Sequence, residues 1–250
     1  MTRVFAFGCS MTNYAWPTWA DIVIHANGGH GENWGIAGGG NVSILNRFVE
    51  ANVRHHFTPD DILLVMWTSP LREDRYVRNQ WFRYGNVHTA PFYDEAFLGK
   101  YWDDRDAVLK TMNSISALNR LAPYASQFAM CPLTELDGYG RKASSEFDDI
   151  YDLYASERDS ISGTLLDFVG GYWTHEKVWS QPDFEEEDYH PAPRTHLAFV
   201  EQIVAPQLDL VIPNETRAWV EYWQACVDRA TQRSETQWGG AMSFDPKSVF

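Results

Sequence analysis

A serine, a histidine and a carboxylate give this sequence its clearest chemical signal. Ser10 follows residues 3–7, which alternate and are rich in β-branched and aromatic side chains, as in a short buried strand. Parallel α/β sheets bind ligands just beyond the carboxyl ends of their strands, so a serine hydroxyl here would be well placed for chemistry. A serine hydroxyl needs a base to become a good nucleophile, and the segment Asp188-x-His190 holds a carboxylate and an imidazole two residues apart. The alternative for Ser10 is a helix cap, since serine is common before helices.

A glycine-rich segment offers a second part of such a site. The pattern Asn33-x-Gly35-x-x-Gly38 accompanies a second predicted strand. A glycine backbone N–H can approach a reacting oxygen closely because no side chain intervenes. A phosphate cradle is disfavoured, since the pattern is not G-x-G-x-x-G after the first strand and no P-loop lysine is present.

The remaining elements place these segments on a parallel sheet. Further strands are predicted at residues 62–67 and 127–130, and residues 137–171 are expected to be helical in part. The predicted helices begin at Pro17 and Pro193 or cover residues 42–55, 106–121 and 214–233. Alternation of strand and helix in this order is typical of a parallel α/β sheet.

Residues 68–104 break this alternation with a segment rich in arginine and aromatic side chains. A long segment that starts at the end of a strand is usually functional or has structure of its own. We therefore expect a lid or substrate wall, with Trp67, Arg72 and Trp81 as substrate contacts. An interface flap is the alternative interpretation.

The three segments together resemble the SGNH (GDSL-like) hydrolase family. They read Gly8-Cys9-Ser10-Met11-Thr12, Asn33-x-Gly35-x-x-Gly38 and Asp188-x-His190-Pro191, and they occur in this order within residues 3–209. The resemblance implies a three-layer α/β/α fold with a flavodoxin-like parallel sheet, an aromatic insertion after strand 3 and a C-terminal helical extension. It divides the chain into an α/β domain at 1–212, with the insertion at about 69–104, and a helix and tail at 213–250.

The resemblance also implies a serine ester hydrolase that removes a small acyl group, such as O-acetyl, from a carbohydrate or similar ester. Ser10 would be the nucleophile, His190 the base and Asp188 the orienting acid. Glu187 has the i−3 spacing more usual in the family, so the choice of acid stays open. No metal or organic cofactor is required.

The oxyanion site implied by the family is altered in this chain. The backbone N–H groups of Ser10 and Gly38 would contribute to it. The family's asparagine after strand 3 is replaced by Trp67-Thr68-Ser69-Pro70, in which Ser69 stands at the asparagine position with a shorter reach. Arg72 and Asn79 are further candidate donors.

A second hypothesis is a binding or structural module that keeps this fold with weak or no catalysis. The altered oxyanion segment, the insertion and the C-terminal extension favour assembly with other chains, for example as a glycan-engaging component of a virion. Turnover of an ester separates the two hypotheses, whereas saccharide binding does not.

Composition narrows the range of partners. The 250 residues carry a formal net charge of −14 spread along the chain, which argues against nucleic acid and against anionic membrane surfaces. Aromatic residues make up 15% of the chain, which suits a carbohydrate surface, a partner interface or an aromatic core. The expected ligand is a small acyl ester or acetylated saccharide, with a homo-oligomer or larger assembly as a possibility.

The three cysteines are odd in number and widely spaced, so they predict neither a disulfide framework nor a zinc site. No signal peptide or membrane-spanning run is recognised, and the expected location is cytoplasmic at synthesis, with incorporation into a particle or release as alternatives.

Overall fold

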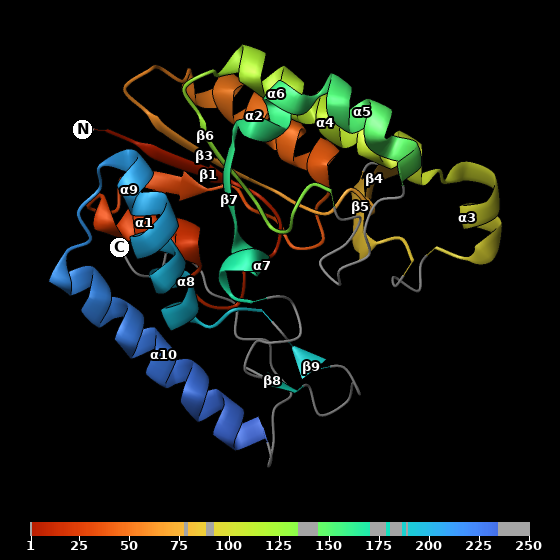
Figure 1. The fold of residues 1–250 in the computed structure, drawn as a ribbon. Helices are drawn as coiled ribbons and strands as arrows, with labels where there is room; N and C mark the ends of the chain where they lie inside the picture. Colours follow the sequence, from red (N-terminus) through yellow and green to blue (C-terminus); the bar gives the residue numbers. More distant parts are fainter. Residues whose placement is uncertain are drawn as a thin grey trace.

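The core of the molecule is a five-stranded parallel sheet, seen here in a computed structural model (Figure 1). The structure describes residues 2–77, 80–88, 93–134, 145–170, 179–180, 187–188 and 190–234. The strands are β1 (Val4–Phe7), β2 (Gly31–Asn33), β3 (Ile62–Trp67), β6 (Ser126–Ala129) and β7 (Ile161–Thr164). Their order is β2-β1-β3-β6-β7, with parallel pairing throughout. This order is the flavodoxin-like one, which confirms the predicted fold class.

Alternating side chains of the central strands build two separate cores. In β1, Val4 and Ala6 belong to one core, whereas Phe5 and Phe7 belong to the other. Both faces of the sheet are therefore apolar and both must be covered by helices.

Helices cover the two faces as the amphipathic patterns predict (Figure 1). One face packs against α1 (Trp19–Ala26), α7 (Leu165–Phe168) and α8 (Pro193–Phe199), which continues through the π-helical segment η3 (Val200–Val204) into α9 (Ala205–Leu208). The other face packs against α2 (Asn41–His55), α4 (Asp104–Leu121) and α5 (Asp148–Leu153). The short elements η1 (Ser145–Phe147) and α6 (Ala155–Asp159) adjoin this second layer.

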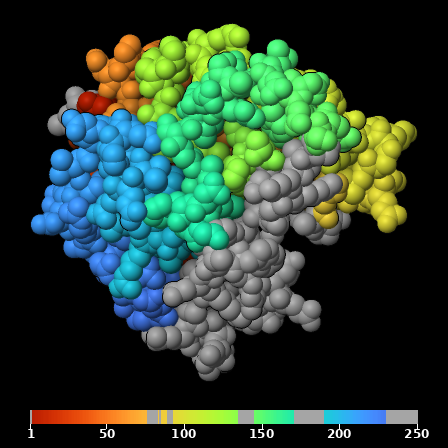
Figure 2. Space-filling model, viewed as in Figure 1, coloured from red at the N-terminus to blue at the C-terminus, as the bar shows by residue number. Residues whose placement is uncertain are grey.

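The insertion after β3 has regular structure of its own. An antiparallel hairpin, β4 (Arg72–Val77) and β5 (Gln80–Asn86), is followed by α3 (Glu95–Tyr101), which lies at the periphery of the molecule (Figures 1 and 2). The backbone N–H of Val87 donates to the carbonyl of Leu71 at 2.9 Å and closes the base of the hairpin. A second short antiparallel pair joins β8 (Trp179–Ser180) and β9 (Glu187–Asp188).

The helix predicted after residue 213 is present as α10 (Asn214–Ser234). It packs against α1 and α8. The ring of His25 stacks on Trp219 with 4.5 Å between centroids, and Arg194 Nε donates to Glu221 at 2.9 Å. Within the described residues, no helix combines the length and apolar character needed to cross a membrane.

One strand was not predicted, and one strand prediction is wrong in detail. Residues 137–171 are helical in part, as expected, in α5, α6 and α7, but the fifth strand, β7, lies among these helices; its sequence Ile-Ser-Gly-Thr is a short edge strand without apolar alternation. The second strand ends at Asn33, where it was expected to begin, because Gly31–Asn33 is a polar edge strand. In both places backbone pairing with a central strand defines the element.

Candidate functional site

Ser10 lies in a single turn directly after β1. The strand order of the sheet reverses between β1 and its neighbour β3. The carbonyl of Cys9 accepts hydrogen bonds from the backbone N–H groups of Thr12 at 2.9 Å and Asn13 at 3.1 Å. Gly8 makes this turn possible, since a Cβ there would lie 2.0 Å from Thr12 Oγ1. Ser10 is 6% exposed, so its side chain lies at the carboxyl edge of the sheet with limited access to water.

A buried polar network ties this turn to the end of β2. Asp21 accepts from the backbone N–H of Thr18 and from the Asn33 side-chain amide, both at 2.9 Å. The Asn33 amide also donates to the carbonyl of Thr12 at 2.6 Å. Burial raises the pKa of Asp21 to about 6, although these hydrogen bonds favour its charged form. The network fixes the backbone of the Ser10 turn.

The predicted oxyanion glycine, Gly38, lies beneath the insertion hairpin. Its φ of 72° is in the left-handed region that favours glycine. The backbone N–H of Gly85 donates to its carbonyl at 3.3 Å, and a Cβ on Gly38 would lie 2.4 Å from the carbonyl oxygen of Arg83. Strand β5 therefore covers the glycine segment, while the oxyanion role of Gly38 stays a prediction.

Asn41, which the sequence analysis did not single out, joins the glycine segment to the end of β3. Its Oδ1 accepts from the backbone N–H of Thr68 at 2.8 Å, and its Nδ2 donates to the Thr68 carbonyl at 2.9 Å. A further hydrogen bond reaches Thr111 Oγ1 on α4 at 2.9 Å. Asparagine directly after three glycines at a predicted helix start was the available sequence signal.

Asp74 in β4 caps α2 from another part of the chain. Its Oδ1 accepts from the backbone N–H of Gly40 and its Oδ2 from that of Ser43, both at 2.9 Å. Burial raises the pKa of Asp74, and these two hydrogen bonds oppose the rise. Local capping rules search next to the helix and so could not find this residue. The hairpin and the glycine segment are therefore held together by a half-buried carboxylate.

The end of β3 differs from the predicted arrangement at Trp67. This side chain is 0% exposed, and its Nε1 donates to Gln127 Oε1 at 2.8 Å. The prediction of Trp67 as a substrate contact is wrong, because the alternation of β3 turns the ring into the core. Ser69 is 2% exposed, and its Oγ accepts from the backbone N–H of Leu71 at 3.1 Å.

Arg72 reaches the same strand ends as Ser10. Its Nη2 lies 3.8 Å from the Sδ atom of Met130, which follows β6. The Sγ of Cys9 lies 4.0 Å from the same sulfur, and Thr68 Oγ1 lies 3.6 Å from it. The ends of β1, β3 and β6 therefore meet at Met130. Trp81 belongs to β5, but its side chain, like the whole of Asn79, lies outside the described residues.

His190 contacts the loop that carries Ser10. Its ring stacks on Tyr14 with 3.8 Å between centroids and 11° between planes. The Nε1 of Trp16 donates to the carbonyl of Pro191 at 2.9 Å. The segment around His190 is thus anchored against residues four and six positions after Ser10. Tyr14 is a further site residue that sequence reasoning missed, although its position in the Ser10 loop was a signal.

The two candidate orienting acids belong to β9, whose backbone pairs with β8. The side chains of Asp188 and Glu187 lie outside the described part of the chain, so the choice between them stays a prediction.

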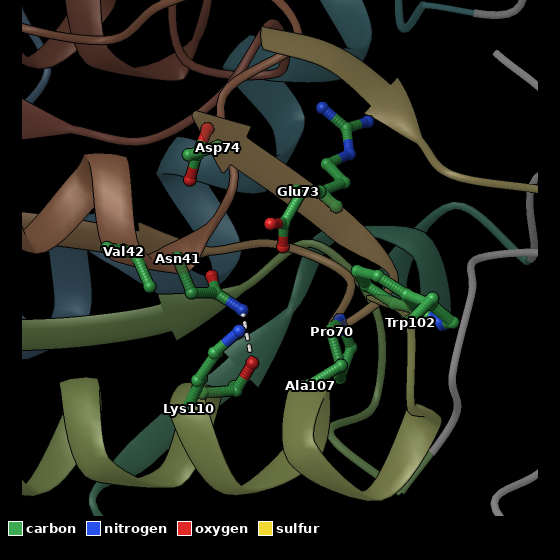
Figure 3. A pocket seen from close by; sticks show the side chains of 10 residues that line it. Asn41, Val42, Pro70, Glu73, Asp74, Trp102, Ala107 and Lys110 are labelled. Atoms are coloured by element: carbon green, nitrogen blue, oxygen red, sulfur yellow. Dashed lines mark hydrogen bonds between the residues drawn. The ribbon is translucent and has the colours of Figure 1, made fainter. Parts of the chain in front are cut away.

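A pocket of about 120 Å³ lies beside Arg72, between α2, β4 and α4 (Figure 3). Its lining comprises Asn41, Val42, Pro70, Arg72, Glu73, Asp74, Trp102, Ala107, Lys110 and Thr111. Pockets for whole drug-sized ligands measure roughly 300–1,000 Å³, so this one suits a substituent. Within the described ranges, no group of three or more His, Cys, Asp or Glu side chains is placed to hold a metal ion.

Comparison with protein-family models and with curated proteins gives no match. Two solved structures are similar to this chain at 15% identity and 83% coverage of it. One is a member of the lipolytic protein G-D-S-L family from Veillonella parvula, with 98% of that chain covered and a TM-score of 0.44. The other is a GDSL-like lipase from Bacteroides thetaiotaomicron, with 88% covered and a TM-score of 0.43. The fold class of this protein follows from its own strand order, as described above.

Proposed function

We propose that this protein is a serine ester hydrolase of the SGNH type. The observation that carries the proposal is the stack of His190 on Tyr14, within the loop that follows Ser10 at the carboxyl end of β1. A histidine and a serine that belong to one packed unit at this edge of the sheet are the two groups that nucleophilic ester cleavage needs. The proposed substrate is a small acyl ester, such as an O-acetyl group on a carbohydrate.

The proposed reaction has two halves. The Oγ of Ser10 attacks the ester carbonyl while His190 takes the hydroxyl proton, and the backbone N–H groups of Ser10 and Gly38 donate to the developing oxyanion. His190 then gives the proton to the departing alcohol, which leaves an acyl-serine. Water attacks this acyl group with His190 again as the base; His190 then returns the proton to the Oγ of Ser10 as the Oγ–acyl bond breaks and the acid is released. Asp188 or Glu187 orients the imidazole throughout.

The first experiment is a burst assay with p-nitrophenyl acetate, combined with intact-mass detection of the acyl adduct. We expect an adduct on Ser10 in the wild type and none in Ser10→Ala, with an unchanged melting temperature. Cys9→Ala is the matched control, because Cys9 is the neighbouring nucleophile and is fully buried. An adduct that persists in Ser10→Ala, or that is lost in folded Cys9→Ala, would refute the assignment.

One observation favours a second candidate, a glycan-binding or structural module with little turnover. Ser69, at the asparagine position, is 2% exposed, and its side chain is shorter than that of asparagine. Loss of one oxyanion donor typically lowers kcat by about 100- to 1,000-fold. Folded protein that binds acetylated saccharide but shows neither turnover nor labelling of Ser10 by a fluorophosphonate would favour this candidate.

A further inference from the structure

Arg72 carries a positive charge that the described carboxylates leave unneutralised at contact distance. The acids next to it have other partners: Glu73 pairs with Arg75 at 3.0 Å, and Asp74 accepts from the two N–H groups of α2. Asp74 feels the charge of Arg72 only as one of the weaker effects that lower its pKa. Among the described residues, the guanidinium contacts the neutral sulfur of Met130, at 3.8 Å.

This charge lies close to the proposed nucleophile. The Nη2 of Arg72 and the Sγ of Cys9 each lie within 4.0 Å of the Met130 sulfur, so they are at most about 8 Å apart. Ser10 follows Cys9 directly. A substrate whose ester carbonyl sits at Ser10 can therefore bring a second functional group to the guanidinium through an extended arm.

We infer that Arg72 binds an anionic substituent of the substrate, so that the protein prefers esters that carry a carboxylate. The inference rests on the proposed function and adds a substrate class to it. A guanidinium offers a planar fork of donors that matches a carboxylate with two parallel hydrogen bonds. The pocket of about 120 Å³ beside Arg72 has the size for such a substituent.

The charge of the whole chain strengthens the case for a specific contact. With a net charge of −14, the molecule repels anions at long range. Selectivity for an anionic ester must therefore come from a local cation at contact distance. Arg72 meets this requirement at the strand ends.

The test compares matched pairs of esters that differ in one charge. Mono-p-nitrophenyl succinate and its methyl ester place the charge on the acyl side, while 4-acetoxybenzoate and its methyl ester place it on the alcohol side. We expect the wild type to prefer the charged member of at least one pair by about 10- to 100-fold in kcat/KM, mainly through a lower KM. Which pair shows the preference identifies the side that carries the anion.

The variants are Arg72→Gln, Arg72→Lys and the control Arg75→Gln. Arg72→Gln should lower kcat/KM on the charged ester by more than on its neutral methyl ester and so abolish the preference, and Arg72→Lys should keep part of the preference because it retains the charge. Arg75 lies on the same strand, but its charge is already paired with Glu73, so Arg75→Gln should retain the full preference.

Three results would overturn the inference. Absence of any preference for the charged esters in the wild type is one, and a preference that survives in folded Arg72→Gln is another. An equal fall in kcat on charged and neutral esters would assign Arg72 to the oxyanion instead. If Ser10 is labelled by a fluorophosphonate and the neutral esters turn over, these results leave the proposed function standing. If no ester is cleaved and Ser10 is not labelled, both proposals fall.

Discussion

Replacement of the half-buried carboxylate of Asp74 is expected to loosen the insertion hairpin from the glycine segment. In Asp74→Asn, one side-chain oxygen can still accept from Gly40 or Ser43, but the amide group faces the other backbone N–H. A hydrogen bond to a charged group contributes about 1.5–3 kcal/mol, and loss of an N-cap costs about 0.5–2 kcal/mol. Burial raises the pKa of Asp74 despite these hydrogen bonds, so the charge itself is not the source of the loss; the loss comes from the backbone N–H that no longer has an acceptor. We therefore expect the free energy of unfolding to fall by about 1.5–3 kcal/mol.

Urea unfolding measures this change as a lower midpoint at an unchanged m-value. Asp103→Asn is the matched control, because Asp103 is exposed and caps its own helix, α4. Its carboxylate accepts from the backbone N–H groups of Arg105 at 2.7 Å and Asp106 at 3.2 Å. The control should cost about 0.5–1 kcal/mol. Hydrogen exchange should accelerate at Gly40 and Ser43 in Asp74→Asn. Equal costs in the two variants, with unchanged exchange at Gly40 and Ser43, would refute the reasoning.

Three further predictions concern the groups around Ser10. The folded state raises the pKa of Asp21 from 3.8 to about 6, so the folded protein keeps the carboxyl proton of Asp21 to a higher pH than the unfolded protein does. Ionisation of Asp21 should therefore lower the free energy of unfolding by about 3 kcal/mol as the pH rises from about 4 to 6. Urea titrations across that range should show this fall in the wild type and not in Asp21→Asn. Equal pH slopes in both proteins would contradict it. Gly38→Ala should destabilise the protein by at least about 1–2 kcal/mol, because Gly38 has a left-handed φ and the new Cβ would lie 2.4 Å from the carbonyl oxygen of Arg83. Gly99→Ala is the control and should not destabilise the protein, because a Cβ on Gly99 in α3 would meet open space. Tyr14→Ala should lower kcat on p-nitrophenyl acetate by freeing the ring of His190, and Tyr14→Phe should retain it; equal rates in both would show that the stack has no role.

Sequence patterns were sufficient where a segment's own side chains determine its structure. Short runs of apolar residues predicted β1 and β3, and both strands are buried on both faces. Helical spacing predicted α2, α4 and α10 with bounds that agree within a few residues. The alternating order of strands and helices was then sufficient to predict that Ser10 lies at the carboxyl edge of a parallel sheet. These features follow from local periodicity because burial of one helix face or of alternate strand residues leaves a regular trace in the sequence.

Sequence patterns failed where contacts with a distant part of the chain determine the local structure. The polar strands β2 and β7 exist because they pair with central strands, and Asp74 caps a helix that begins 33 residues before it. Trp67 was expected at a substrate surface, but its place in the strand alternation buries it. The free energy of these features comes from contacts between segments far apart in the chain, so no local pattern records them.

The candidate site divides in the same way. The residue types at Ser10, Gly38 and His190 and their order along the chain determined which chemistry to expect. Only the tertiary structure brought Tyr14 against His190 and the Arg72 guanidinium to the sulfur of Met130. A guanidinium at the end of a long side chain can serve any of several partners, and packing of the hairpin against the strand ends determines which one it reaches.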